Sequence, residues 1–226
     1  MPEQPILAGR HGFFGKLPCR GDFVSRNLPR GFIDPWDRWL QHGMAAAKVA
    51  LDDAWPHSFV EGPSWQFVVA PGILGPQAVV GLLAPSCDRV GRLFPLTIAI
   101  LTNAAPDSAE AAAWLSPLAP LTAQARAGHL DPDQLLVALD AASLCSVACA
   151  EAAPPPVTDI RETPLAALSR IGARESLWWT AGNARMAASW LRSPALPPAE
   201  KFHAFYSEQS AKPGWGETPS ASGANS

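Results

Sequence analysis

The runs WQFVVA (residues 65–70), AVVGLLA (residues 78–84) and LFPLTIAIL (residues 93–101) decide the fold. Each run is short, contains Val, Ile or Phe, and is bounded by Gly, Pro or other turn residues, which is the pattern of β-strands. The first two runs do not alternate polar with apolar residues. We therefore expect helices to cover both faces of the sheet that these strands form.

Helices are predicted on both sides of these strands along the chain. The clearest start is Asp34-Pro35, because an aspartate can cap the free amides of a first turn and a proline there loses no hydrogen bond. A second helix should be bent or broken by Pro117 and Pro120. That second helix is predicted over residues 107–126. A third is predicted over residues 131–150, with Asp131-Pro132 as its cap and first residue, and further helices over residues 164–171 and 198–208. Further strands are predicted over residues 7–17 and 176–180.

This order of elements predicts an α/β fold: a three-layer sandwich with a mixed β-sheet covered by helices on both faces. We expect one domain over residues 1–210. Residues 211–226 are rich in Ser, Gly and Pro and are expected to form a disordered tail.

Composition excludes several classes of protein. The chain has 17 Lys and Arg against 20 Asp and Glu, a formal net charge of −3, so it offers no basic surface for nucleic acid or an anionic membrane. Gly and Pro interrupt every apolar stretch before it reaches the roughly 18 residues of a spanning helix. The first five residues lack the features of a secretory signal. Its 4 cysteines are irregularly spaced, so we expect a cytoplasmic protein without a disulfide framework.

The segment Gly9-x-x-Gly12-x-x-Gly15-Lys16 allows two interpretations. It resembles a glycine-rich phosphate loop, which would make the chain a small-ligand-binding protein or an enzyme. However, such a loop needs four residues between its glycines and a Ser or Thr after the lysine, whereas Leu17 follows here. The alternative is a strand whose glycines let another backbone approach closely.

No catalytic, cofactor or metal site is predicted. The chain lacks a Gly-x-Ser-x-Gly elbow, and its 5 histidines are scattered without a motif. Cys145 and Cys149 share a helix face, but a zinc site needs two further ligands, and His129 has no partner histidine. We therefore expect a non-enzymatic protein without cofactors.

Three clusters stand out at residues 16–23, 85–95 and 176–179. One interpretation is structural: Arg–Asp pairs that fix the ends of strands. The other is a protein-binding surface, in which charged residues surround apolar anchors. Neighbouring strand residues point to opposite faces, so one of the two adjacent tryptophans is expected to be an exposed anchor. The candidate binding residues are Lys16, Arg20, Asp22, Asp88, Arg89, Arg92, Trp178 and Trp179.

The same clusters resemble, in order, the motifs of the TagF (ImpM) family, which is associated with bacterial type VI secretion. The resemblance is dense from Gly12 to Leu101 and thins toward Phe205. It is carried by GFFGKLP (residues 12–18), RGDF (20–23), LPR (28–30), DPWDxWL (34–40), WxF (65–67), APGxxG (70–75), PSxDxVGRxFPL (85–96) and SLWW (176–179).

The resemblance implies a cytoplasmic α/β protein that represses type VI secretion after translation. It would do so by binding a forkhead-associated-domain scaffold, separately from the kinase and phosphatase of that pathway. The resemblance supplies no catalytic residues. A structural component of the secretion apparatus is a further alternative.

Overall fold

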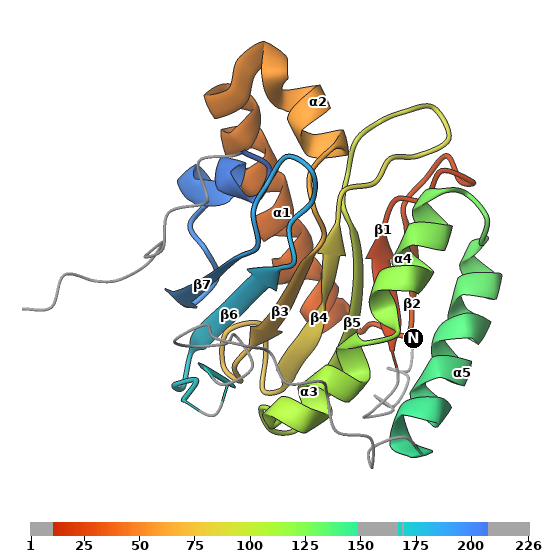
Figure 1. The fold of residues 1–226 in the computed structure, drawn as a ribbon, viewed down its shortest axis with the longest axis vertical. Coiled ribbons are helices and arrows are strands. Elements are labelled where there is room, and N and C mark those ends of the chain that lie inside the picture. The colour runs from red at the N-terminus through yellow and green to blue at the C-terminus, as the bar shows by residue number, and fades with distance from the viewer. Residues whose placement is uncertain (1–10, 149–166, 169, 208–226) are drawn as a thin grey trace, which may run out of the picture.

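The structure, a computed structural model, describes residues 11–148, 167–168 and 170–207 (Figure 1). Within this part of the chain, seven strands form one sheet in the order β2-β1-β5-β4-β3-β6-β7. The strands are β1 (Gly12–Gly15), β2 (Val24–Arg26), β3 (Trp65–Val69), β4 (Ala78–Ala84), β5 (Leu96–Thr102), β6 (Glu175–Thr180) and β7 (Ser189–Pro194).

Helices cover both faces of this sheet, so the predicted three-layer α/β fold is confirmed. Figure 1 shows α1 behind the sheet and α3 and α4 in front of it. The elements of the first helical layer are α1 (Arg30–Leu51), η1 (Asp52–Ala54), α2 (Trp55–Val60) and η2 (Ala199–Phe205). The other layer contains α3 (Ser108–Leu115), α4 (Leu118–Arg126) and α5 (Pro132–Ala148).

The sheet is antiparallel throughout its described strands, so the expectation of a mixed sheet was wrong. Short loops, not helices, join β3 to β4 and β4 to β5, and a short loop can only join antiparallel neighbours. Apolar runs without alternation are common in parallel strands because helices cover both faces. Here two helical layers cover an antiparallel sheet, which produces the same sequence pattern.

Alternate residues of the central strands enter two separate cores. Phe67 and Val69 of β3 pack in the core beneath α1, α2 and η2, while Val68 between them faces α3, α4 and α5. The same alternation places Trp178 in the first core and Trp179 in the second. Both faces of the sheet are therefore buried, which explains why its strands are apolar at successive positions.

The first helix starts five residues before the predicted site, at Arg30 instead of Pro35. Pro29 takes the N-cap position, and Pro35 lies inside α1 rather than at its start. The buried face of α1 begins with Phe32 and continues through Trp36 and Leu40. A helix that started after Asp34 would leave Phe32 outside this face, so the earlier start buries one more large apolar side chain. Burial of this face outweighs the hydrogen bond that a proline removes.

The predicted break in the second helix is confirmed, since α3 ends at Leu115 and α4 starts at Leu118. Asp107 caps α3 by accepting hydrogen bonds from the amides of Ala109 and Glu110. Asp131 does the same for α5, as its sequence predicted. The helix expected near residues 198–208 is a 3₁₀ helix.

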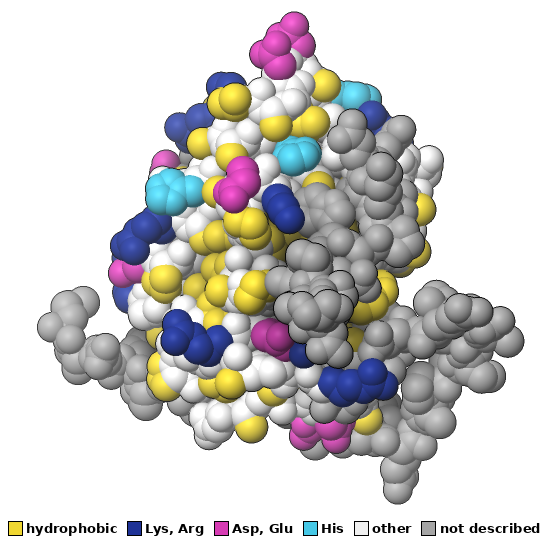
Figure 2. Space-filling view, turned by 90° about the vertical axis from the view of Figure 1, so that its left-hand side faces the viewer, with side chains coloured by type: hydrophobic (Ala, Val, Ile, Leu, Met, Phe, Trp, Pro, Cys, Tyr) yellow, Lys and Arg dark blue, Asp and Glu magenta, His cyan; other side chains and the backbone are white. Residues whose placement is uncertain are grey.

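Several predictions fall outside the described residues: the tail 211–226, Gly9, and most of the helix expected over 164–171. Within the described part, no helix is long and apolar enough to cross a membrane. On the side of the molecule that carries β7 and η2, charges of both signs are interspersed with apolar side chains (Figure 2).

Candidate functional site

A buried carboxylate, Asp88, joins two loops at one end of the sheet. Its side chain is 0% exposed and forms ion pairs with Lys16 at 3.0 Å and with Arg92 at 2.6 Å. Lys16 follows β1, while Asp88 and Arg92 lie between β4 and β5. We call these three residues the Asp88 clasp, and the segments 16–23 and 85–95 the loop pair.

The local sequence gives Asp88 this position. Its Oδ1 accepts hydrogen bonds from the amides of Val90 and Arg92, at 3.1 and 2.9 Å, which closes an Asx turn. Gly91 completes the turn with a φ of 81°, a conformation that glycine adopts without strain. An aspartate followed three residues later by a glycine therefore sets the shape of this turn.

Four hydrogen-bonding groups keep Asp88 ionised. Burial alone would raise the pKa of its carboxyl. The hydrogen bonds from the Arg92 amide, the Lys16 ammonium, the Arg92 guanidinium and the Val90 amide outweigh burial, and together they hold the pKa of Asp88 well below its usual range. The carboxylate is thus a fixed negative charge at neutral pH.

Hydrogen bonds to three backbone carbonyls also join the two loops. The Arg89 amide donates to the Arg20 carbonyl at 2.8 Å, and the Ser86 hydroxyl donates to the Lys16 carbonyl at 2.8 Å. The Arg92 guanidinium donates to the Gly21 carbonyl. The loop pair is consequently one rigid unit, although its halves lie about 70 residues apart in the sequence.

The loop pair brings together six of the eight candidate binding residues. Lys16, Asp88 and Arg92 hold the loops, as the structural interpretation predicted. Arg20, Asp22 and Arg89 lie on the same loops with exposed side chains. The structural interpretation therefore accounts for Lys16, Asp88 and Arg92, while Arg20, Asp22 and Arg89 stay candidates for the protein-binding interpretation.

Two apolar residues of the loop pair were missed as site residues. Phe23 is 50% exposed and Val90 is 69% exposed. The Phe23 ring stacks on Phe14 at 5.7 Å and meets the edge of Phe94 at 4.7 Å, with the Lys16 ammonium 5.2 Å from its centroid. A large apolar residue within a charged loop was the available sequence signal.

Neither Trp178 nor Trp179 is an exposed anchor, so this prediction was wrong. Trp178 is 0% exposed and Trp179 is 9% exposed. The two side chains do point to opposite faces of β6, but helices cover both faces. The tryptophan pair belongs to the two cores and is not part of the surface that the loop pair forms.

The glycine-rich segment forms a strand, as its alternative interpretation predicted for Gly12 and Gly15. A Cβ at Gly12 would lie 2.5 Å from the Arg26 carbonyl oxygen, and one at Gly15 would lie 2.1 Å from that of Pro95. Both glycines thus admit neighbouring backbone. Lys16, which would contact phosphate in a nucleotide loop, pairs with Asp88 instead.

The other kinds of site considered from the sequence were a metal site and a pair of cysteines. The described residues contain no group of three or more His, Cys, Asp or Glu that could hold a metal ion. Cys19 and Cys87 are free thiols. The shared helix face predicted for Cys145 and Cys149 concerns side chains outside the described residues.

A pocket of about 310 Å³ lies beside the end of α2. It is lined by Ser58, Glu61, Gly62, Pro63, Asn183, Arg185, Met186, Tyr206 and Ser207, and so is separate from the glycine-rich strand.

The fold and the site define an α/β protein whose helix-covered antiparallel sheet carries a rigid, cross-linked loop pair at one end. The chain belongs to the TagF family, because the model of the TagF N-terminal domain, described as type VI secretion system-associated, matches residues 12–142. It is also similar to the crystal structure of PA0076 from Pseudomonas aeruginosa PAO1, with 35% identity and a TM-score of 0.72. That similarity covers 87% of this chain and 94% of the other. A comparison with curated proteins gave no match.

The stability that the Asp88 clasp provides should depend on pH. Replacing Asp88 with asparagine should lower the thermal midpoint by several degrees at pH 7, because the buried Lys16 ammonium loses its anion. The folded-state pKa of Asp88 is lowered, so its stabilisation is present above the unfolded pKa, about 3.9, and is lost as the pH falls below it. The gap between wild type and variant should therefore narrow below about pH 4. Circular dichroism melts at pH 7 and in acid measure this gap.

Asp22→Asn is the control, since Asp22 is exposed on the same loop and no ion pair or hydrogen bond holds its carboxylate within the described structure. Equal melting of Asp88→Asn and wild type at pH 7 would contradict a stabilising clasp.

Proposed function

We propose that this chain represses type VI secretion after translation, as a non-enzymatic protein of the bacterial cytoplasm that binds a forkhead-associated-domain scaffold. The observation that carries the proposal is membership of the TagF family over residues 12–142. Both loops of the loop pair lie within this matched range. Binding to the scaffold would withhold it from assembly of the secretion apparatus.

The geometry of the site favours binding over catalysis. Asp88 is the buried carboxylate of the site, and its two oxygens are occupied by Lys16, Arg92 and two backbone amides. A general base needs a pKa near the working pH and access to a substrate proton. Asp88 has neither, so its charge serves to hold the loops.

The ligand-binding alternative receives no support from the segment on which it rested. Gly12 and Gly15 are packed against backbone, and the Lys16 side chain is 9% exposed and paired with Asp88. The remaining alternative, a structural component of the apparatus, predicts the opposite result on deletion. One experiment separates it from a repressor.

Deleting the gene should raise type VI secretion, and the wild-type chain supplied in trans should restore repression. The measurement is the amount of secreted effector or tube protein in culture medium, together with co-purification of the scaffold by the tagged wild-type chain. Loss of secretion on deletion would identify a structural component instead. Unchanged secretion, or failure to capture the scaffold, would contradict the proposed function.

A further inference from the structure

The loop pair presents apolar side chains on a rigid base. Within the described residues, five large hydrophobic side chains are exposed, and two of them, Phe23 and Val90, lie on these two loops. Phe23 is held by contacts with Phe14 and Phe94 and by the Lys16 ammonium above its ring. Val90 lies in the turn that Asp88 and Gly91 fix. Side chains ordered before binding lose little entropy when a partner covers them.

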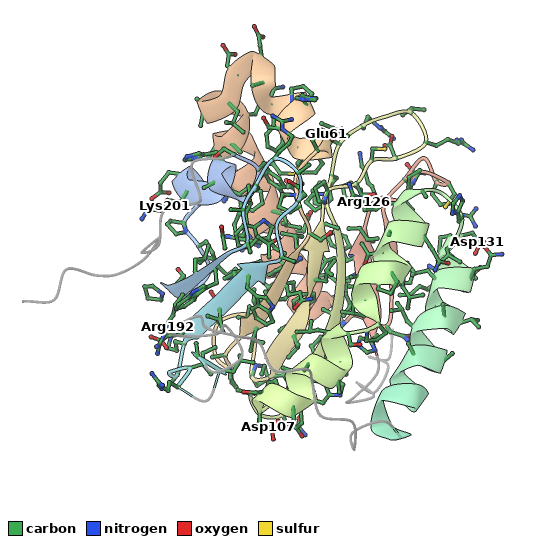
Figure 3. All side chains as sticks on the ribbon, viewed as in Figure 1. Glu61, Asp107, Arg126, Asp131, Arg192 and Lys201 are labelled. Carbon is green, nitrogen blue, oxygen red and sulfur yellow. The ribbon has the colours of Figure 1, made fainter. Side chains whose placement is uncertain are left out.

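The charge of the loop pair is positive, although the whole chain is acidic. Four cations face two carboxylates, and Asp88 is already bound to two of the cations. The cations are Lys16, Arg20, Arg89 and Arg92, and the carboxylates are Asp22 and Asp88. Asp131, the cap of α5, is labelled in Figure 3. Hydrogen bonds from the amides of Gln134 and Asp133, together with the nearby charge of Arg20, lower the pKa of Asp131. Because Lys16 and Arg92 share Asp88 and Arg20 lies near Asp131, the excess of positive charge centres on Arg89.

Arg89 is the cation that is available to a partner. Its backbone amide is bound to Arg20, but its guanidinium makes no hydrogen bond or ion pair within the described structure. That guanidinium lies over Gly21, 3.7 Å from where a Cβ would stand. Arg92 reaches the carbonyl of the same glycine. Two guanidinium groups therefore meet at one point of the loop pair, one of them without an anion.

We infer that Phe23, Val90 and Arg89 form a docking surface for an acidic protein segment that carries an apolar side chain. The acidic group would pair with Arg89, and the apolar group would cover Phe23 and Val90. Arginine and aromatic residues at the centre of a fixed surface are the usual source of binding energy in protein interfaces. The inference rests on the proposed function, because it assigns this surface to contact with the scaffold.

The test uses Arg89→Glu and Val90→Asp in the full chain, with purified scaffold as the binding probe. Each variant should weaken scaffold binding at least about tenfold, because one reverses a docking charge and the other places a carboxylate in an apolar contact. Wild-type binding should also weaken from about 0.05 to about 0.3 M salt, and Arg89→Glu should reduce that dependence. Thermal midpoints should stay close to that of wild type, since neither side chain holds the loops.

Two control variants match these changes. Val137→Asp alters a valine on α5 with the same exposed fraction as Val90, 69%. Lys201→Glu reverses an exposed charge on η2, away from the loop pair (Figure 3). Both controls should bind the scaffold as wild type does and should restore repression in the deletion strain.

The outcomes separate the inference from the proposed function. If wild type binds and represses while Arg89→Glu and Val90→Asp bind equally well, the docking surface is wrong and the proposed function stands. Equal loss of binding in the two controls also overturns the surface. If wild type itself neither binds the scaffold nor represses, the proposed function and the docking surface fail together.

Discussion

Trp178→Ala is expected to destabilise the protein by about 3–5 kcal/mol, the range for removing a large aromatic side chain from a core. Trp178 is fully buried and stacks on Trp36 with ring planes 3° apart and centroids 6.0 Å apart. It also contacts Phe67 and Phe205, so rings from α1, β3 and η2 all pack against it. Whole domains are stable by only about 5–15 kcal/mol, so the variant should keep a small margin. Urea unfolding followed by fluorescence and circular dichroism measures the loss.

Two further variants provide comparisons, one at Trp178 and one at a less buried tryptophan. Trp178→Phe keeps a ring in the core but loses the indole bond to the Ser176 hydroxyl, 2.9 Å long, so its effect should be smaller. Trp190→Ala removes a half-buried tryptophan from β7 and should also cost less. If Trp178→Ala unfolds like wild type, the packing described for this core is wrong. If it unfolds as expected, any loss of scaffold binding by it reflects folding and not a contact.

The burial of Trp178 and Trp179 could have been predicted from the sequence. The apolar run at Phe67-Val68-Val69 already indicates that helices cover both faces of the sheet. The same reasoning places successive tryptophans of a neighbouring strand in two cores. The expectation of an exposed anchor used the alternation of side chains correctly but assumed one open face. Because helices cover both faces of the sheet, both tryptophans are buried.

Other features could not be read from local patterns. β7 (Ser189–Pro194) is an edge strand that mixes polar and apolar residues, and β2 (Val24–Arg26) has three residues, so neither gives a strand signal. The start of α1 depends on the packing of Phe32 against the sheet, which no capping rule contains. By contrast, Asp107 and Asp131 act within one turn, and the helix starts expected at these two residues were predicted correctly.

The candidate site was predicted as separate clusters but not as an assembly. The sequence marked Lys16, Asp88 and Arg92 as unusual charges at strand ends. Their pairing depends on β1 lying beside β5, an arrangement that brings Gly15 opposite Leu96. Spacing along the chain carries no information about that neighbour. The split between holding residues and presented residues therefore needed the three-dimensional structure.

Gly15→Ala is expected to be the most damaging small substitution in the site, with a loss of at least about 3 kcal/mol. Gly15 has a φ of 141°, which other residues rarely adopt. A Cβ there would lie 2.1 Å from the Pro95 carbonyl oxygen and 2.9 Å from the Leu96 Cα. Both are backbone atoms, one in the first residue of β5 and one in the residue before it, so the clash can be relieved only by moving β1 away from β5. That movement would also carry Lys16 away from Asp88.

Gly75→Ala separates backbone strain from the clash. Gly75 has nearly the same φ, 143°, but nothing lies within 4 Å of its added Cβ. It should therefore lose only the strain, about 1–3 kcal/mol, and the excess loss in Gly15→Ala measures the close approach of the two strands. Chemical denaturation of both variants provides the comparison. Equal losses would mean that β1 does not lie against Pro95 as described.

The same pair of variants tests what the glycine-rich segment is for. If Gly15 served a ligand, Gly15→Ala would fold normally and lose only the ligand's effect on stability. If Gly15 admits the β5 backbone, the variant should lose stability and scaffold binding together, because opening the clasp frees the Arg89 loop. Gly75→Ala should bind the scaffold normally while it remains folded. Normal folding of Gly15→Ala would thus remove the structural role of this glycine and revive the ligand-binding alternative.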